Sequence, residues 1–426
     1  MGRGLQTAYC TATIIVMLKM GIILRFIFIV GSCVINFASA TVITTTREDD
    51  DDEIIMNNPW AARDSDGTWK PLFEEEDEIG YARSLIVDMP PVVSLQSPHQ
   101  NIQVYNSDHY GKVLELDDCL QLTERDAAHY NEMLAHVPVM EYLARRRNSE
   151  PIKALVIGGG DGYVVSELLK YKQISSIDHV ELDEEVVNVS KEHLPWADAW
   201  NDERVNLVIG DGASFVKNQA ERGKSYHVII QDASDPYWLG EDGTVHTLPS
   251  SVLYDASHFE SLYGLLRKKE GVLIFQSETY NLPSNLQSIR KWRKLLEGIG
   301  FEKPRYGSIS IGTYSTGQHG FFVAHARQNG AGKEKYCTFD KMDLLPELNW
   351  DQILAQFAHL KGTTLYYHPR IHRSSFDLPI WVEEVIYGDV SVLPASTEDV
   401  WKENMGKPHR NNGRPDVTSV RLRGMR

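Results

Sequence analysis

Short stretches rich in glycine and acidic residues recur through the middle of the chain, each directly after a run of β-branched residues. They are GGGDG at 158–162, ELDEE at 181–185, GDG at 210–212 and DASDP at 232–236. Helix-like segments separate them, at 163–170, 184–193 and 213–219. This alternation predicts a parallel βαβ sheet, in which ligands bind beyond the carboxyl ends of the strands. The glycine and acidic residues therefore predict one shared binding site.

The acids of the first three stretches suit a nucleoside that carries positive charge. Glycines after the first strand allow a tight turn and a close approach of the backbone to a ligand. Asp161 lies inside this loop, where its charge would repel a phosphate or the carboxylate of S-adenosylmethionine and attract an ammonium. Glu181 lies where an acid accepts hydrogen bonds from ribose hydroxyls, and Asp211 with Gly212 could receive an adenine amino group.

The fourth stretch suits a cationic second substrate. Asp232 and Asp235 lie three residues apart, just before Pro236. One carboxylate can hold an ammonium while the other accepts a proton. Three of the stretches also have a purely structural explanation, since Asp161 could cap a helix, Glu181 could be a solvated acid and the fourth stretch could be a plain turn. The occurrence of all four in this order favours the functional interpretation.

The ordered stretches resemble the aminopropyltransferases, above all the spermidine synthases. The likeness continues in residues 99–133, 312–322 and 365–379, so that it covers roughly residues 80–385. It implies a Rossmann-like, doubly wound α/β sheet of the class I methyltransferase type, preceded by a small antiparallel β-domain, and a homodimer. The implied reaction moves the aminopropyl group of decarboxylated S-adenosylmethionine to putrescine, giving spermidine and methylthioadenosine. That donor is a co-substrate, and no cofactor or metal is implied.

The resemblance also implies a role for individual residues of this sequence. Asp232 corresponds to the proton acceptor, assisted at the catalytic centre by Tyr130 and Asp235. The residues implied to bind the amine are Tyr130, Asp235, Gln276 and Tyr314. The residues implied to bind the donor are Gln100, Leu116, Gln121, Gly158, Asp161, Glu181, Asp211 and Gly212.

The chain departs from the family pattern near the amine. The link at 237–259 is longer than the family's, and Tyr163 stands where the family commonly has a small residue. These departures leave the length of the acceptor open, so synthesis of spermine or thermospermine stays possible. The sequence is also compatible with an S-adenosylmethionine-dependent methyltransferase, which Asp161 disfavours, and with a non-catalytic polyamine-binding protein. Five histidines without metal-ligand spacing are interpreted as structural or surface residues: His129, His246, His258, His319 and His372.

Composition predicts a globular enzyme with more than one domain. The chain has 426 residues, of which 42% are hydrophobic, enough for a substantial core. Its net charge of −16 disfavours nucleic acid as a partner and is compatible with a small polyamine. Acidic runs at 48–53 and 74–78 contribute much of this charge and are typical of solvated segments.

We expect six segments along the chain. They are a leader at 1–40, an acidic disordered linker at 41–78, an N-terminal β-domain at 79–145, a catalytic domain at 150–330, a C-terminal extension packed on it at 331–388, and a polar basic tail at 389–426. The leader is apolar and ends in Ala38-Ser39-Ala40, which predicts a signal peptide or a membrane anchor and a place in the secretory pathway. An organelle address or a cytoplasmic protein with another start codon would also fit this leader.

Overall fold

The computed structural model describes residues 27–30, 33–36, 69–76, 81–146, 148–239, 245–267, 270–327 and 348–388. The chain divides into two units, Met1–Trp60 and Ala61–Arg426. In the first unit, β1 (Ile27–Val30) pairs antiparallel with β2 (Cys33–Asn36). These strands give no support to the predicted signal peptide or anchor, and the rest of the leader and the predicted tail lie outside the described residues. Within the described ranges, none of the helices has the length and apolarity needed to cross a membrane.

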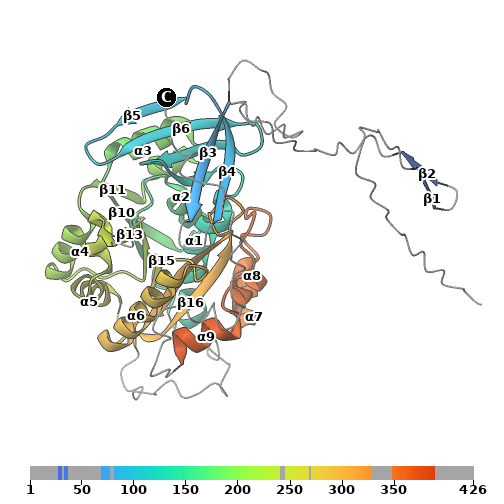
Figure 1. Ribbon diagram of the computed structural model, residues 1–426. Helices are drawn as coiled ribbons and strands as arrows, with labels where there is room; N and C mark the ends of the chain where they lie inside the picture. The colour runs from blue at the N-terminus through green and yellow to red at the C-terminus, as the bar shows by residue number, and fades with distance from the viewer. Residues whose placement is uncertain are drawn as a thin grey trace, which may run out of the picture. The chain divides into compact units, whose positions relative to one another are not determined.

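The second unit is built on a seven-stranded sheet with the order β11-β10-β9-β12-β15-β17-β16 (Figure 1). Its parallel strands are β9 (Ile152–Gly158), β10 (Ile174–Glu181), β11 (Val205–Ile209), β12 (Val228–Asp232) and β15 (Val272–Ser277). The antiparallel edge consists of β16 (Glu302–Ser310) and β17 (Gln318–His325). The predicted doubly wound α/β fold is therefore confirmed.

Alternate strand residues pack into two hydrophobic cores, one on each face of the sheet. On β9, Ala154 and Val156 face one core, whereas Leu155 and Ile157 face the other. The first core includes residues of α1 (Ala127–Arg145), α2 (Tyr163–Leu169) and α7 (Trp350–Phe357). The second includes residues of α4 (Gly212–Glu221), α5 (Ala256–Leu265), α6 (Pro283–Ile299) and α9 (Ile380–Tyr387). Burial on both faces explains the continuous β-branched runs of the sequence.

The segment before the catalytic sheet contains two smaller antiparallel sheets. One has four strands, namely β5 (Val93–Gln96), β6 (Asn101–Ser107), β7 (Gly111–Leu116) and β8 (Cys119–Thr123). A turn at 108–110 joins β6 to β7, and Ser107 pairs with Gly111 across it. The other is the hairpin of β3 (Trp69–Glu76) and β4 (Tyr81–Asp88).

Two predicted boundaries differ from the structure. Residues 69–76 lie in the range expected to be a disordered linker but form β3, where Glu74 pairs in register with Arg83. Pairing with a partner strand has overridden the low β-propensity of the acidic run. The range expected for the β-domain also includes α1, which packs in the first core of the catalytic sheet. Sequence patterns identify a helix but not the layer on which it packs.

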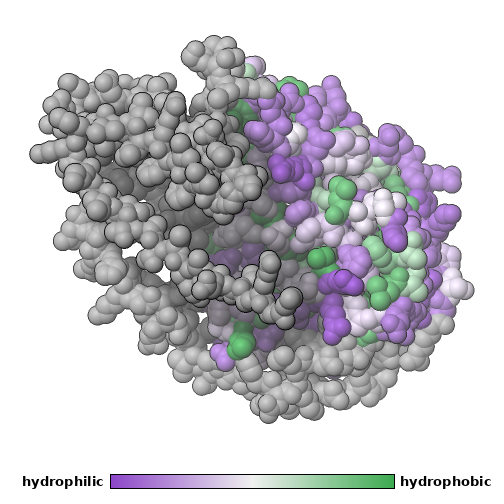
Figure 2. All heavy atoms as spheres, turned by 90° about the vertical axis from the view of Figure 1, so that its right-hand side faces the viewer, coloured by the Kyte–Doolittle hydropathy of each residue, from purple (hydrophilic) through white to green (hydrophobic). Residues whose placement is uncertain are grey.

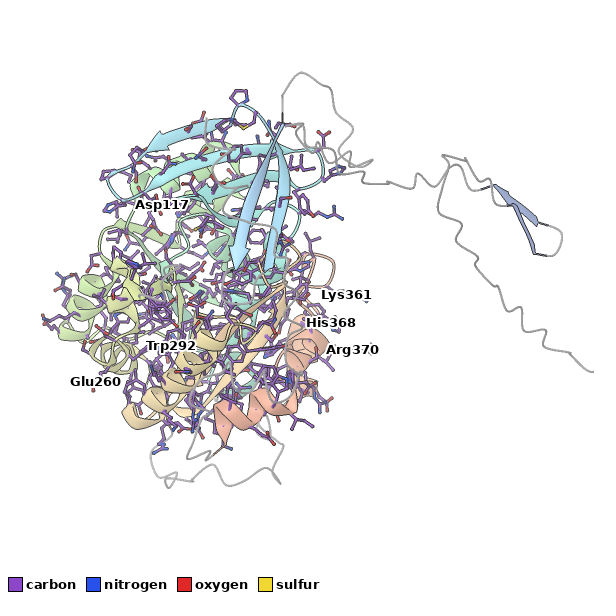
Figure 3. The ribbon with its side chains drawn as sticks, in the orientation of Figure 1. Asp117, Glu260, Trp292, Lys361, His368 and Arg370 are labelled. Atoms are coloured by element: carbon purple, nitrogen blue, oxygen red, sulfur yellow. The ribbon has the colours of Figure 1, made fainter. Side chains whose placement is uncertain are left out.

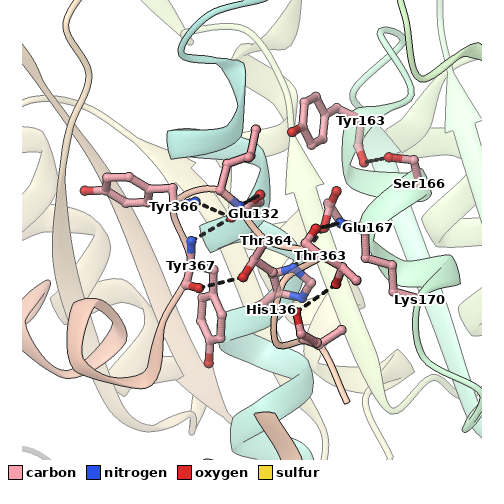
Figure 4. Close-up of polar contacts among 12 residues, drawn as sticks. Glu132, His136, Tyr163, Ser166, Glu167, Lys170, Thr363, Thr364, Tyr366 and Tyr367 are labelled. Atoms are coloured by element: carbon pink, nitrogen blue, oxygen red, sulfur yellow. Dashed lines mark hydrogen bonds and ion pairs between the residues drawn. The ribbon is translucent and has the colours of Figure 1, made fainter. Parts of the chain in front are cut away.

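The C-terminal segment is bonded to α1 through one buried carboxylate. Glu132 accepts hydrogen bonds from the backbone N–H groups of Leu365, Tyr366 and Tyr367, at 2.7, 2.8 and 2.6 Å (Figure 4). The ring of Tyr366 also stacks on His129, with a centroid distance of 4.2 Å. The segment leads into α8 (Pro369–Ser374). These contacts fix the C-terminal segment against the helix that carries Tyr130.

Figure 2 shows the side of the molecule on which α8 lies in Figure 1. Hydrophilic residues cover most of its coloured part, and hydrophobic residues are scattered among them (Figure 2). Exposed apolar residues that occur singly are normal on protein surfaces. The coloured part of this face therefore gives no argument for a docking site.

We expect Glu132→Gln to destabilise the fold by about 2 kcal/mol, because the new amide NH₂ faces backbone donors that lose an acceptor. Urea unfolding measures the effect. The matched control is Glu260→Gln, since Glu260 is exposed on α5 and lies at the edge of the catalytic unit (Figure 3). Equal midpoints for the two variants would contradict this account of the C-terminal segment.

Candidate active site

Most of the predicted site residues converge where the strand order reverses. From β9 the chain continues to β10 on one side, whereas β12 and β15 follow on the other. Gly158 at the end of β9 pairs directly with Asp232 at the end of β12. In open α/β sheets, ligands bind outside the carboxyl ends of the strands at this kind of switch point.

Two glycines allow the first loop to approach Asp232. Gly158 has a φ of 77°, and a Cβ there would lie 2.0 Å from the backbone oxygen of Asp232. Gly159 has a φ of 69°, and its Cβ would lie 2.8 Å from Oδ2 of Asp232. A Cβ at Gly158 would push the two strand ends apart, whereas a Cβ at Gly159 would displace the Asp232 carboxylate. The glycines are therefore favoured by contact as well as by backbone conformation.

Asp161 lies in the same loop and is bonded to the start of α2. Its Oδ1 accepts a hydrogen bond of 2.8 Å from the backbone N–H of Tyr163. Burial, together with the charge of Asp232, raises the pKa of Asp161 well above its usual range. The ring of Tyr163 packs on Trp196 at a centroid distance of 4.4 Å.

Three aromatic residues that sequence reasoning does not identify hold the glycine loop. Trp200 donates from Nε1 to Nδ1 of His179 at 3.0 Å, which leaves Nε2–H of His179 to donate to the backbone oxygen of Gly158 at 2.8 Å. Burial lowers the pKa of His179 to about 4, so the ring is neutral as this pattern requires. Trp196 donates to the backbone oxygen of Asp161 at 2.7 Å. No motif links residues 196–200 to the loop, so only the fold shows this contact.

Asp232 is bonded to the first predicted tyrosine. Tyr130, on α1, donates from its hydroxyl to Oδ1 of Asp232 at 2.7 Å. Burial raises the pKa of Asp232 to about 6, and the hydrogen bond from Tyr130 works against this rise. Burial and the Asp232 charge raise the pKa of Tyr130 well above 10, so the hydroxyl stays a donor.

Asp235 is held by residues from two other elements. Gln276, in β15, donates from Nε2 to Oδ1 of Asp235 at 2.6 Å and accepts from the Tyr254 hydroxyl at 2.5 Å. Burial raises the pKa of Asp235, and its hydrogen bonds with Gln276 and Glu278 act in the opposite direction. Tyr254 belongs to the long link at 237–259, so this departure from the family pattern contributes directly to the site. The sequence marks the link as unusual but does not single out this residue.

The second predicted tyrosine is carried by a loop that Asp126 anchors. The Asp126 carboxylate accepts hydrogen bonds from the backbone N–H of Thr313 at 2.9 Å and from its hydroxyl at 2.8 Å. The next residue, Tyr314, contacts the His319 ring edge-on at a centroid distance of 4.5 Å. The same imidazole lies 5.3 Å from the ring of Tyr130. The two tyrosines expected near the amine therefore flank one histidine.

Two of the predicted donor residues, Gln100 and Glu181, meet at Asp183. Its Oδ2 accepts hydrogen bonds from Gln100 at 3.0 Å and from Ser97 at 2.6 Å, which ties the β-domain to the end of β10. The backbone N–H of Asp183 donates to Oε1 of Glu181 at 2.9 Å, and burial raises the pKa of Glu181 to about 7. Asp183 belongs to the second acidic stretch, but its linking role cannot be predicted from that stretch alone.

The remaining predicted donor residues differ in placement. Leu116 is partly buried and packs against the cluster that contains Tyr163. Asp211 is exposed and caps α4, which begins at Gly212, by accepting from Ser214 N–H at 2.7 Å. Gln121 is exposed on β8 and donates to the backbone oxygen of Cys119 at 3.3 Å, so this contact does not join it to the other residues. Among the described residues, no cluster of His, Cys, Asp or Glu could hold a metal ion.

Comparison with known proteins agrees with this geometry. A spermine/spermidine synthase domain matches residues 127–333, and a spermidine synthase tetramerisation domain matches 92–124. The chain is 34% identical over 294 residues to spermidine synthase 2 of Arabidopsis thaliana, covering 68% of this chain and 76% of that one. The chain belongs to the spermidine synthase family. It is thus an enzyme of the aminopropyltransferase class, and the match to the tetramerisation domain indicates a multimer.

Other similar proteins have names that specify two different reactions. The chain is 33% identical to the polyamine aminopropyltransferase of Clostridioides difficile (strain 630), covering 68% of this chain and 90% of that one. It is also 33% identical to putrescine N-methyltransferase 2 of Nicotiana attenuata, covering 68% and 70%. A spermidine synthase crystal structure in complex with the transition-state analogue AdoDATO is similar in fold, with a TM-score of 0.60, 24% identity and coverage of 77% and 99%.

We expect Gly159→Ala to lower turnover about 100-fold, because its Cβ would displace the Asp232 carboxylate. The matched control is Gly223→Ala, since Gly223 has a similar φ of 65° but nothing within 4 Å of its Cβ. Both variants share the cost of about 1–2 kcal/mol for a side chain in the left-handed region. Steady-state rates and thermal melting separate the two effects. Equal activity of the variants would refute the contact argument.

Proposed function

We propose that this member of the spermidine synthase family transfers the aminopropyl group of decarboxylated S-adenosylmethionine to putrescine. The observation that carries the proposal is the hydrogen bond from Tyr130 to Asp232 at the switch point of the sheet. A second carboxylate, Asp235, lies three residues along the same loop and is held by Gln276. This arrangement provides one acid to accept a proton and another to hold a cationic amine.

In the proposed reaction, the lone pair of the putrescine nitrogen forms a bond to the methylene carbon next to the sulfonium. The carbon–sulfur bond breaks, and its electron pair neutralises the sulfur, which leaves as methylthioadenosine. The attacking nitrogen loses a proton to Asp232, and spermidine results. Alkylamines are protonated at pH 7, whereas Asp232, with a pKa of about 6, is mostly ionised there. Asp232 can therefore accept the proton, and alignment of the two substrates contributes most of the rest.

The distal ammonium of putrescine is assigned to Asp235, with Gln276 and Tyr314 beside it. A bound cation favours the ionised form of a buried carboxylate, which would reverse the effect of burial on the pKa of Asp235. The donor is assigned to the carboxyl ends of β9, β10 and β11. There Gly158 and Asp161 would face the sulfonium side of the donor. Glu181 and Gln100 would bind its ribose. Asp211 and Gly212 would bind its adenine. Leu116 would contact the donor from the β-domain.

N-methyl transfer to putrescine is the second candidate, because one relative at 33% identity is a putrescine N-methyltransferase. The two reactions differ in their donor, since S-adenosylmethionine keeps a carboxylate that the decarboxylated form lacks. Three acids, Asp161, Glu181 and Asp232, already lie in this part of the site. Burial and the charge of Asp232 both raise the pKa values of Asp161 and Glu181. An additional carboxylate there would be repelled, which favours the decarboxylated donor.

Product analysis by mass spectrometry tests the proposal on the purified full chain. Each of the two donors is combined with putrescine, cadaverine or spermidine in separate tubes. We expect spermidine and methylthioadenosine only from the decarboxylated donor with putrescine. N-methylputrescine would establish the second candidate, and product from spermidine alone would assign a longer acceptor. Sedimentation of the same preparation tests the proposed homodimer, which would have twice the chain mass of 48.3 kDa.

Asp232→Asn tests the proton acceptor. We expect this variant to lose about 10²- to 10⁴-fold in kcat while still binding methylthioadenosine in calorimetry. Since burial raises the pKa of Asp232 to about 6, kcat/KM of the unmodified enzyme should fall as pH decreases through that value. The variant should lack this acidic limb and keep only the slope due to ionisation of the amine. A variant with an unchanged rate and pH profile would remove Asp232 from the mechanism.

A further inference from the structure

A buried imidazole that the mechanism does not use lies beside the proposed amine site. His319 has an exposed fraction of 6% and belongs to the start of β17. In the register of β15 and β17, Ser277 pairs with Gly320 and Gln276 with Phe321. His319 therefore lies just beyond the carboxyl end of β15, at the same edge of the sheet as Gln276 and Asp232. Its type and spacing alone indicate only a structural residue.

The imidazole lies between the two tyrosines assigned to the amine. Its ring is edge-on to Tyr314 at 4.5 Å and to Tyr130 at 5.3 Å between centroids. Tyr130 is in turn bonded to the proton acceptor Asp232. A single residue, Tyr130, thus separates His319 from Asp232.

One nitrogen of this ring is left without a partner. Nδ1 of His319 is buried and has no hydrogen-bond partner within the described part of the chain. Two other buried imidazoles are bonded through both nitrogens: His136 to Tyr171 and Glu167, and His372 to Tyr367 and Glu141. Burial lowers the pKa of His319 to about 3, so the ring is neutral and offers one acceptor and one donor nitrogen.

We propose that His319 is a specificity-determining residue for the acceptor, and that its unpartnered Nδ1 accepts a hydrogen bond from an N–H of an aliphatic amine lying between Tyr130 and Tyr314. The inference rests on the proposed aminopropyl transfer. An uncharged acceptor adds a directional contact without adding to the acidic charge of Asp232 and Asp235. The Nδ1 contact therefore discriminates between amines by the position of a nitrogen along the chain, whereas the two carboxylates discriminate by positive charge.

Two substitutions distinguish this role from simple packing. His319→Phe keeps an aromatic ring of similar size against both tyrosines but removes the nitrogens. His319→Asn places an amide oxygen near the position of Nδ1. We expect the Phe variant to raise KM for the amine about tenfold, the value of one hydrogen bond, with the affinity for methylthioadenosine unchanged. The Asn variant should recover most of the lost affinity.

His227→Phe is the matched control, because His227 is also buried, has an unpartnered Nε2 and packs on the ring of Tyr142, but precedes the opposite end of β12. Its KM for the amine should not change. Thermal melting confirms that each variant is folded.

An unchanged KM in His319→Phe would overturn the inference, as would equal losses in the Phe and Asn variants. If the unmodified enzyme makes no product with any amine, the proposed function fails. Calorimetry with putrescine alone then still tests His319, since the expected tenfold loss of affinity needs no turnover.

Discussion

A group of acidic side chains at the carboxyl edge of one sheet is the constraint on which the rest of this structure depends. Asp161, Glu181, Asp232 and Asp235 all have pKa values raised by burial, and Asp232 adds to the shift at two of them. Each group binds its proton more tightly in the folded chain than in the unfolded one. This tighter proton binding stabilises the folded chain fully at pH values below the ordinary carboxyl pKa. The stabilisation is lost as the pH rises through the raised pKa values of the folded state. A bound cation offsets that loss, so the cluster is matched to a positively charged ligand.

The chain holds these acids together by close backbone contact and by neutral donors. Gly158 and Gly159 let the first loop touch Asp232. Trp196, Trp200 and His179 then fix the loop through its carbonyl oxygens, without introducing a charge that would neutralise the acids. A lysine or arginine in these positions would satisfy the carboxylates permanently and remove the preference for a cationic substrate.

Helix α1 connects this site to the parts of the chain that surround it. Asp126 at its start anchors the loop of Tyr314, Tyr130 reaches Asp232, and Glu132 binds the C-terminal segment. Three polar residues at the start of a mostly buried helix thus bond to segments that lie 187, 102 and 235 positions away in the sequence. The burial of these groups makes their hydrogen bonds strong and their loss costly.

The sequence by itself determined the parallel sheet, the order of its acidic stretches and the acids that meet in the site, because alternating β-branched runs and glycine loops have local physical causes. Asp161, Asp232 and Asp235 can be named from these stretches, whereas Tyr130, Gln276 and Tyr314 can be named only through the resemblance to the family. Tertiary structure alone decided which groups hold them. Tyr254, His179, Trp200 and Asp126 act through contacts between distant segments, and no spacing in the sequence encodes such contacts. The same reason explains why the side chain of Gln121, predicted with the donor residues, bonds to its own strand. It also explains why the sequence context of His319 does not indicate the role that we propose for it.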